Sequence, residues 1–228
     1  VVLITGGTGA LGRTLVKKFI DSGAITISSF LNEKEAEKLK TANPKVEMIE
    51  LDIGKEEQIL KMIPILVKRF GTINILVNVV GGYLGGKSIT ELSGTDWDTM
   101  MNLNLKSAFL ISKHVIPIMK SGNGGNVVHI SSRTGLKSEG YDSAYAASKA
   151  AVVSLSQSMM AEWRKENIRV ITLTPSTIAS DMSIQGGLTD GNPETVLQPE
   201  DFAEWVRDIL KMNRRALIAN GSIFSTNP

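Results

Sequence analysis

Tyr145, Lys149 and Ser132 are the residues whose types and spacing can do chemistry. Tyr145 and Lys149 are four residues apart, so on a helix their side chains share one face. An ammonium beside a phenol favours the phenolate, and we expect Lys149 to lower the pKa of Tyr145 from its ordinary value of about 10. Ser132 follows an apolar stretch, and its hydroxyl can bond to the substrate oxygen on which negative charge develops. The three residues predict a proton-transfer site.

A tyrosine and a lysine at this spacing also occur by chance as a solvated pair on a helix. Tyr141 does not share the pattern, because the residue four positions after it is Tyr145 and not a lysine. The spacing therefore selects one tyrosine, and its assignment to a reactive site depends on the rest of the chain.

The chain begins with an apolar stretch, Val1–Thr5, that runs directly into the glycine-rich segment Gly6–Gly12. Glycines in such a turn let the backbone approach a pyrophosphate closely, and the amides at the start of the following helix donate to the anion. A tight turn without a ligand is the alternative, but a strand before it and a helix after it favour a nucleotide-binding loop. We expect the phosphates to lie on Gly9–Gly12.

Apolar strand-like stretches alternate with amphipathic helical stretches along the chain. We expect strands at Val1–Thr5, Ile25–Phe30, Val46–Leu51, Ile73–Asn78, Asn126–Ser131, Arg169–Thr174 and Ser222–Thr226. We expect helices at Leu11–Ser22, Glu33–Thr41, Lys55–Phe70, Thr95–Ser121, Ser143–Glu166 and Pro199–Met212. This alternation predicts an α/β fold, a doubly wound parallel sheet of about seven strands with helices on both faces. The apolar stretches Val46–Leu51 and Ile73–Asn78 predict strands buried on both faces.

The predicted motifs fall beyond the carboxyl ends of the strands, where ligands of such sheets bind. They are Gly6–Gly12, Asp52, Asn78–Gly81, Ser132 and Pro175–Met182. Motifs far apart in the sequence are therefore expected to meet in one crevice. A single domain, residues 1–228, suffices to hold it.

The order of these segments resembles that of the short-chain dehydrogenase/reductase family, which has a Rossmann fold, over nearly the full length of the chain. The family's active-site tetrad corresponds to Asn104, Ser132, Tyr145 and Lys149. The resemblance implies a cofactor site made of Gly6, Thr8, Gly9, Leu11, Gly12, Ser29, Asp52, Ile53, Asn78, Gly81, Tyr145, Lys149, Pro175 and Ile178. Asp52 would meet the adenine, and the segment from Pro175 would meet the nicotinamide amide.

This resemblance implies hydride transfer between a nicotinamide ring and the carbon of a carbonyl or secondary alcohol, with Tyr145 moving the proton on oxygen. It also implies that Lys149 binds the ribose hydroxyls of the nicotinamide and that Asn104 helps to hold a water chain to solvent. Ala10 departs from the family pattern but is expected to leave cofactor binding intact. Val79-Val80 and Ser176 also depart from it, and they are expected to change details of the cofactor shelf without affecting the proton donor.

The cofactor is expected to be NADP, with NAD as the alternative, because no acidic residue ends the second strand, Ile25–Phe30. A carboxylate there would bind the ribose 2′-hydroxyl of NAD and repel the 2′-phosphate of NADP. Ser28, Ser29, Asn32 and Arg13 lie near enough in the sequence to meet that phosphate.

The sequence leaves the substrate open. Gly81–Lys87, with Tyr83 as a candidate to stack on a flat substrate, resembles the pterin-reducing branch of the family, dihydropteridine reductase. That branch lacks the serine that Ser132 supplies here, which favours a carbonyl substrate. A 3-oxoacyl-carrier-protein reductase is the competing enzyme, with Arg133 or Lys165 available to meet an acidic carrier. A nicotinamide-cofactor sensor without catalysis is the alternative from another class, and the intact tetrad argues against it.

The segment Ser183–Gln198 follows the sixth strand, where the family closes its substrate pocket, and it contains several glycines. It is interpreted either as a mobile lid or as a plain surface loop.

Composition sets limits on these interpretations. The chain has 228 residues, a net charge of +2 and no cysteine. The chain has no block of basic residues of the kind that indicates nucleic-acid binding. It also has no apolar run that approaches the ~18 residues of a membrane span. The absence of cysteine fits a cytoplasmic protein. His114 and His129 are expected to lack the partners of a metal site, so no metal is predicted. The resemblance implies a homodimer or homotetramer built on the helices at Thr95–Ser121 and Ser143–Glu166.

Overall fold

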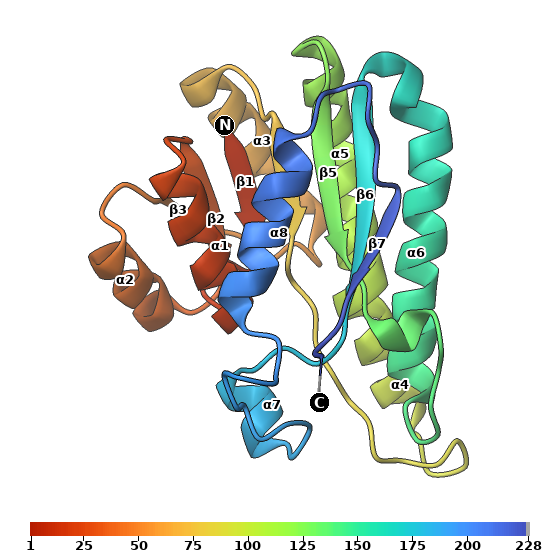
Figure 1. The fold of residues 1–228 in the computed structure, drawn as a ribbon. Coiled ribbons are helices and arrows are strands. Elements are labelled where there is room, and N and C mark those ends of the chain that lie inside the picture. Colours follow the sequence, from red (N-terminus) through yellow and green to blue (C-terminus); the bar gives the residue numbers. More distant parts are fainter. Residues whose placement is uncertain (227–228) are drawn as a thin grey trace.

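The computed structural model describes residues 1–226 and forms a seven-stranded parallel sheet in the order β3-β2-β1-β4-β5-β6-β7 (Figure 1). All six strand pairs are parallel. The strands are β1 (Val2–Thr5), β2 (Thr26–Phe30), β3 (Glu47–Glu50), β4 (Ile75–Asn78), β5 (Gly125–Ile130), β6 (Ile168–Pro175) and β7 (Asn220–Ile223). The predicted doubly wound fold is confirmed.

Neighbouring residues of a strand point to opposite faces of the sheet. Helices cover both of these faces. They are α1 (Ala10–Asp21), α2 (Glu33–Ala42), α3 (Glu56–Phe70), α4 (Gly94–Met100), α5 (Ser107–Ser121), α6 (Ser143–Trp163), α7 (Asp181–Gln185) and α8 (Pro199–Lys211). Val2 and Ile4 of β1 pack in a core with α1 and α8. Leu3 lies between them in sequence and packs in a second core with α3, α5 and α6.

The edge strand β3 corrects one expectation. Three of its four residues are partly buried and Glu50 is exposed, whereas the apolar pattern of Val46–Leu51 had predicted burial on both faces. The apolar residues that are buried, Val46 and Leu51, flank the strand, while glutamates occupy both of its ends. An edge strand has one neighbour and less cover, so polar residues are tolerated there. By contrast, β4 is central and largely buried, as predicted.

Two helical predictions also need correction. The stretch Thr95–Ser121 is not one helix: a π-helical segment, η1 (Met101–Lys106), separates α4 from α5. The short helix α7 was not predicted at all, and its start is fixed by a capping box between Ser180 and Ser183. π-Helical segments are rare and often occur at functional sites, which directs attention to Asn104 inside η1.

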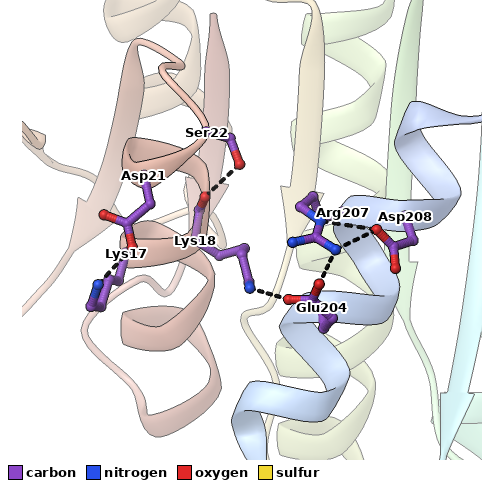
Figure 2. A network of polar contacts seen from close by, with 7 residues as sticks. All are labelled: Lys17, Lys18, Asp21, Ser22, Glu204, Arg207 and Asp208. Carbon is purple, nitrogen blue, oxygen red and sulfur yellow. Dashed lines mark hydrogen bonds and ion pairs between the residues drawn. The ribbon is translucent and has the colours of Figure 1, made fainter.

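A network of exposed ion pairs joins α1 to α8 (Figure 2). Lys18 of α1 pairs with Glu204 of α8, and Glu204 also pairs with Arg207. Arg207 reaches Asp208 at 2.6 Å, and Lys17 reaches Asp21 at 2.6 Å. The apolar core beneath these helices stabilises their packing more than the ion pairs do, because exposed pairs contribute little.

Within residues 1–226, no helix is both long enough and apolar enough to cross a bilayer.

Candidate active site

The glycines of the loop between β1 and α1 let its backbone pack closely on itself and on β2. Gly6 has a φ of 67°, in the left-handed region that favours glycine. A Cβ on Gly12 would overlap the carbonyl oxygen of Gly6, and one on Gly7 would overlap the Ser28 hydroxyl. Ala10 is the first residue of α1 and has no positive φ. The methyl group of Ala10 therefore does not strain the backbone of the loop, as expected.

A cavity of about 500 Å³ opens beside this loop and fits the adenine half of a dinucleotide. Its lining includes five of the predicted cofactor residues: Gly6, Thr8, Ser29, Asp52 and the buried Ile53. The carboxylate of Asp52 accepts from the backbone N–H of Gly54 at 2.9 Å, which fixes its orientation at the end of β3. The described residues therefore fit a nicotinamide dinucleotide at this end of the sheet.

The serines at the end of β2 differ from the prediction. Ser29 lines the cavity, but its hydroxyl accepts from the backbone N–H of Gly6 at 3.1 Å. Ser28 points away, is fully buried, and packs against Gly7. It is therefore not available to a 2′-phosphate. Asn32 lines the cavity while its side chain caps α2, and Arg13 lies 3.9 Å from Glu35.

Four of the remaining predicted cofactor residues hold the backbone or pack in the core beneath the crevice. Asn78 ends β4 and accepts from the Thr5 hydroxyl, which in turn accepts from the N–H of Val79. Leu11 packs into the core below α1. Pro175 ends β6, and Ile178 packs against the same core.

Tyr145 and Lys149 lie on one face of α6, as their spacing predicted. The ammonium nitrogen of Lys149 lies 5.8 Å from the centre of the Tyr145 ring and donates to the carbonyl of Ile130 at 3.1 Å. Ser132 follows β5, and its hydroxyl lies close enough to the phenol of Tyr145 to lower the pKa of that phenol. Its hydroxyl also accepts from the N–H of Thr134 at 3.2 Å, which holds it at the start of a 3₁₀ turn. The structure thus brings Ser132, Tyr145 and Lys149 together.

The electrostatics of the site correct one expectation. Burial raises the pKa of Tyr145, the nearby Asp142 carboxylate adds to this, and the hydrogen bond from Ser132 opposes it. Burial lowers the pKa of Lys149 to about 8. The cost of desolvating the phenolate thus outweighs the attraction of the ammonium that the sequence suggested. At neutral pH, Tyr145 is protonated and can act as a proton donor.

Asn104 lies in η1 and is buried, and its amide fastens the loop after β4. Its oxygen accepts from the N–H of Gly82 at 2.9 Å, and its nitrogen donates to the carbonyl of Gly82 and to the Ser148 hydroxyl. A Cβ on Gly81 would come within 2.8 Å of the Asn104 oxygen and 3.2 Å of the Lys149 nitrogen. Asn104, Lys149 and Gly81 therefore meet at one point. Both amide hydrogens of Asn104 are engaged, so only its oxygen could serve a water chain.

Sequence reasoning missed Asp142, which precedes α6 and accepts from the Tyr83 hydroxyl at 2.9 Å. The ring of Tyr83 stands edge-on to that of Tyr145, with centroids 5.0 Å apart. A Cβ on Gly85 would overlap both Asp142 and the Tyr83 hydroxyl, so this glycine permits the contact. Burial, followed by the hydrogen bond to Asp142, raises the pKa of Tyr83 to about 12. An acid three residues before the reactive tyrosine was the available signal.

The segment 183–198 is tied down at both of its ends. Ser183 is buried and donates to the carbonyl of Ile178, and the N–H of Leu197 donates to the Ser225 hydroxyl at 2.9 Å. Gly187 and Gly191 between them have positive φ values. Motion of this segment as a lid stays a prediction.

The two histidines have different partners. His129 is buried, and its Nε2 pairs with the Ser112 hydroxyl at 3.2 Å; burial, helped by the charge of Lys149, lowers its pKa to about 4. His114 lies 2.7 Å from a carboxylate oxygen of Glu56, so the expectation that it lacks a carboxylate partner is wrong. Among residues 1–226 no group of three or more acidic, histidine or cysteine side chains could hold a metal ion.

Comparisons with known proteins agree with this geometry. The family model of the short chain dehydrogenases matches residues 1–189. The 3-oxoacyl-[acyl-carrier-protein] reductase FabG of Thermotoga maritima is 30% identical over 190 residues, which cover 80% of this chain and 76% of that protein. An NAD-dependent glycerol dehydrogenase of Listeria innocua is 31% identical over 80% of this chain and 72% of its own length.

Solved structures show the same fold. The serine dehydrogenase of Escherichia coli superimposes with a TM-score of 0.87 at 26% identity, covering 97% of this chain and 96% of that one. ElxO with bound NADP superimposes with a TM-score of 0.90 at 24% identity, over 98% and 96% of the two chains. With the sheet order, the glycine loop and the family match in agreement, this chain belongs to the short-chain dehydrogenase family of oxidoreductases.

Proposed function

We propose that this protein interconverts a carbonyl compound and a secondary alcohol with a nicotinamide cofactor, using Tyr145 as the proton donor and acceptor. The observation that carries the proposal is the grouping of Tyr145, Ser132 and Lys149 at the carboxyl ends of the strands, where the glycine loop also lies. The cofactor supplies or accepts the hydride when bound. The chain's own residues handle the proton.

In the reduction direction, the protonated phenol of Tyr145 gives its proton to the carbonyl oxygen of the substrate. The Ser132 hydroxyl bonds to the same oxygen and stabilises the negative charge that develops on it. Lys149 stabilises the phenolate that remains, because its ammonium lies nearby in a buried setting. Lys149 would also bind the ribose hydroxyls of the cofactor. Asn104 positions the loop after β4, against which Lys149 lies.

The cofactor we favour is NADP. The rim of the cavity at the end of β2 is formed by Ser29, Phe30, Leu31 and Asn32, none of which carries the carboxylate that would bind NAD and repel a 2′-phosphate. Arg13, just after the glycine loop, is the cation that the sequence offered for this phosphate, although Glu35 competes for it at 3.9 Å. Steady-state kinetics with NADPH and NADH should give a higher kcat/KM for NADPH. A large preference for NADH would overturn the cofactor assignment and leave the reaction assignment standing.

The reaction is tested by following the absorbance of reduced nicotinamide with a panel of ketones, acyl thioesters and quinonoid pterins. We expect oxidation with a ketone. Tight cofactor binding without oxidation by any of them would favour a non-catalytic sensor.

An acyl-carrier-protein reductase is the second candidate, supported by Arg133 at the mouth of the site. Arg133 lines a cavity of about 380 Å³ beneath the segment 183–198, although it also pairs with Glu139 at 2.6 Å. Lys165 lies beyond the far end of α6 and so cannot serve the same carrier. Preferred turnover of acyl thioesters would select this candidate.

We also propose that the protein is a homodimer or homotetramer of cytoplasmic chains packed through α4, α5 and α6. Trp97 of α4 and Phe109 of α5 expose 38% and 44% of their surface, respectively, and such an assembly would cover them. A light-scattering mass of two or four times the 24.6 kDa chain is expected. A monomeric mass would contradict the proposed assembly and leave the proposed reaction unaffected.

A further inference from the structure

A second cavity, of about 340 Å³, lies at the amino edge of the sheet, where β5 and β6 begin. Figure 1 shows this edge at the opposite end of α6 from the carboxyl ends of the strands. Tyr145 lies in the first turn of α6, and Arg164 follows its last residue. A helix of 21 residues is about 30 Å long at ~1.5 Å per residue. The cavity is therefore separate from the site around Tyr145.

The lining of this cavity carries one sign of charge. Among residues 1–226, five basic side chains border it and no acidic one does: Arg164, Lys165, Arg169, Arg214 and Arg215. None of the five forms an ion pair with any residue in the described part of the chain. The acid beside them in sequence, Glu166, pairs instead with Lys120 at 3.4 Å. A chain whose net charge is only +2 thus concentrates five unneutralised cations at one concave place.

One guanidinium of the group is fixed in place. Arg169 of β6 donates to the Asn126 side chain at 2.7 Å and to backbone carbonyls at the end of α8 and in the loop after it, including that of Ala216 at 3.0 Å. Arg214 donates to the carbonyl of Asn123. Burial, together with the charge of Arg214, lowers the pKa of Arg169, so the two guanidinium groups repel one another. An anion between them would relieve this repulsion.

We propose that this cavity binds a compact small-molecule polyanion carrying two or more phosphate groups. Guanidinium groups match phosphate oxygens in pairs, and Arg164 and Arg215 are the members of the group that can offer such a pair. Arg169 already donates from all three of its side-chain nitrogens to protein acceptors, so it contributes its charge. The volume is at the lower end of the range for small-molecule sites. A concave site favours a small ligand over a membrane or a nucleic acid, which would contact a broad surface. The proposal does not depend on the reaction assigned to Tyr145.

Calorimetric titration of the protein with sodium tripolyphosphate tests the proposal. One titration is made without NADP and a second with saturating NADP, which occupies the glycine loop so that this loop cannot supply the signal. We expect a dissociation constant in the micromolar range that rises with salt. The double variant Arg164→Gln/Arg215→Gln should weaken binding at least tenfold. Neither of these two side chains forms a hydrogen bond with another described residue, in contrast to Arg169 and Arg214. Their replacement should therefore leave the stability of the fold nearly unchanged.

The matched control is Lys45→Gln/Lys61→Gln, which removes the same charge from exposed positions outside the cavity. It should leave the dissociation constant within about twofold, since distant exposed charges are screened. Equal weakening by both double variants would show a general field effect and overturn the site. So would binding that disappears when NADP is saturating, or no binding at all. Stronger binding to phosphatidylserine vesicles or duplex DNA, without competition by tripolyphosphate, would also overturn it.

Discussion

The surroundings of Tyr145 and the seam between α1 and α8 use charge in opposite ways. The seam holds several ion pairs at the surface, among them the contacts of Glu204 with Lys18 and Arg207 (Figure 2). The site around Tyr145 holds one buried ammonium, Lys149, which pairs with no carboxylate among residues 1–226. At this buried site desolvation lowers the pKa of Lys149 to about 8. Burial, and not the number of ionic contacts, decides where charge has chemical consequences.

The largest effect should come from Tyr145→Phe, which removes the proton donor and keeps the ring. Loss of general acid–base assistance should lower kcat by about 10²–10⁴-fold, while NADP binding measured by fluorescence stays nearly unchanged. Tyr141→Phe is the matched control, because Tyr141 is exposed and should tolerate the change. Near-normal turnover by Tyr145→Phe would remove this residue from the mechanism.

Acid should destabilise the protein through His129. Its pKa is about 4 in the folded protein, below the ordinary histidine value of 6.5 that applies to the unfolded chain. Between these two values the unfolded chain binds more protons than the folded one. The free energy of unfolding therefore falls as the pH drops from 6.5 towards 4, by up to about 3 kcal/mol for a shift of this size. Urea unfolding at pH 7 and pH 5 measures the loss.

His129→Gln should flatten that pH dependence, whatever its effect on stability at pH 7. His114→Gln should retain it, because His129 is still present. A His129→Gln protein that loses as much stability in acid as the unmodified one would place the effect elsewhere.

The sequence predicted the parts of the site that depend on local periodicity. Tyr145 and Lys149 share a face because a helix returns after about four residues, and the glycine loop follows from a strand that meets a helix. Strand parity could also have separated the two serines of β2, since Ser28 and Ser29 must point to opposite faces. Only Ser29 reaches the cavity.

Other features depend on contacts between distant segments and left no local pattern. Asn104 in η1 accepts a hydrogen bond from Gly82, and nothing in the sequence around Asn104 indicates a π-helical segment. Asp142 meets Tyr83 across 59 residues. The pKa of Tyr145 could not be read from its spacing to Lys149, because the dominant cause is desolvation, which only the folded structure reveals.

Asp142→Asn should shift the pH profile by a smaller amount. The groups that face Tyr145 are Asp142 just before α6, Lys149 on α6, Ser132 after β5 and Tyr83 after β4. Because the Asp142 carboxylate raises the pKa of Tyr145, its removal should lower that pKa. The alkaline limb of kcat/KM for ketone reduction should then move to lower pH, by less than about one unit, since Asp142 is partly solvated.

Glu139→Gln is the control for Asp142→Asn. Glu139 acts on Tyr83 and pairs with Arg133, and it is not among the causes that shift the pKa of Tyr145. The control should leave the profile in place. A uniform fall in rate without a shift would mean that Asp142 only positions the start of α6.

The smallest effect should come from the seam in Figure 2, where a double-mutant cycle of Lys18→Met and Glu204→Gln isolates one ion pair. Exposed pairs typically contribute ~0.2–1 kcal/mol, because water already solvates both charges and ordering the side chains costs entropy. We expect a coupling energy in that range from urea unfolding, decreasing further at 1 M salt. Glu204 keeps Arg207 as a partner when Lys18 is removed, which lowers the coupling further. A coupling of several kcal/mol would show that contact number, and not burial, governs charge in this protein.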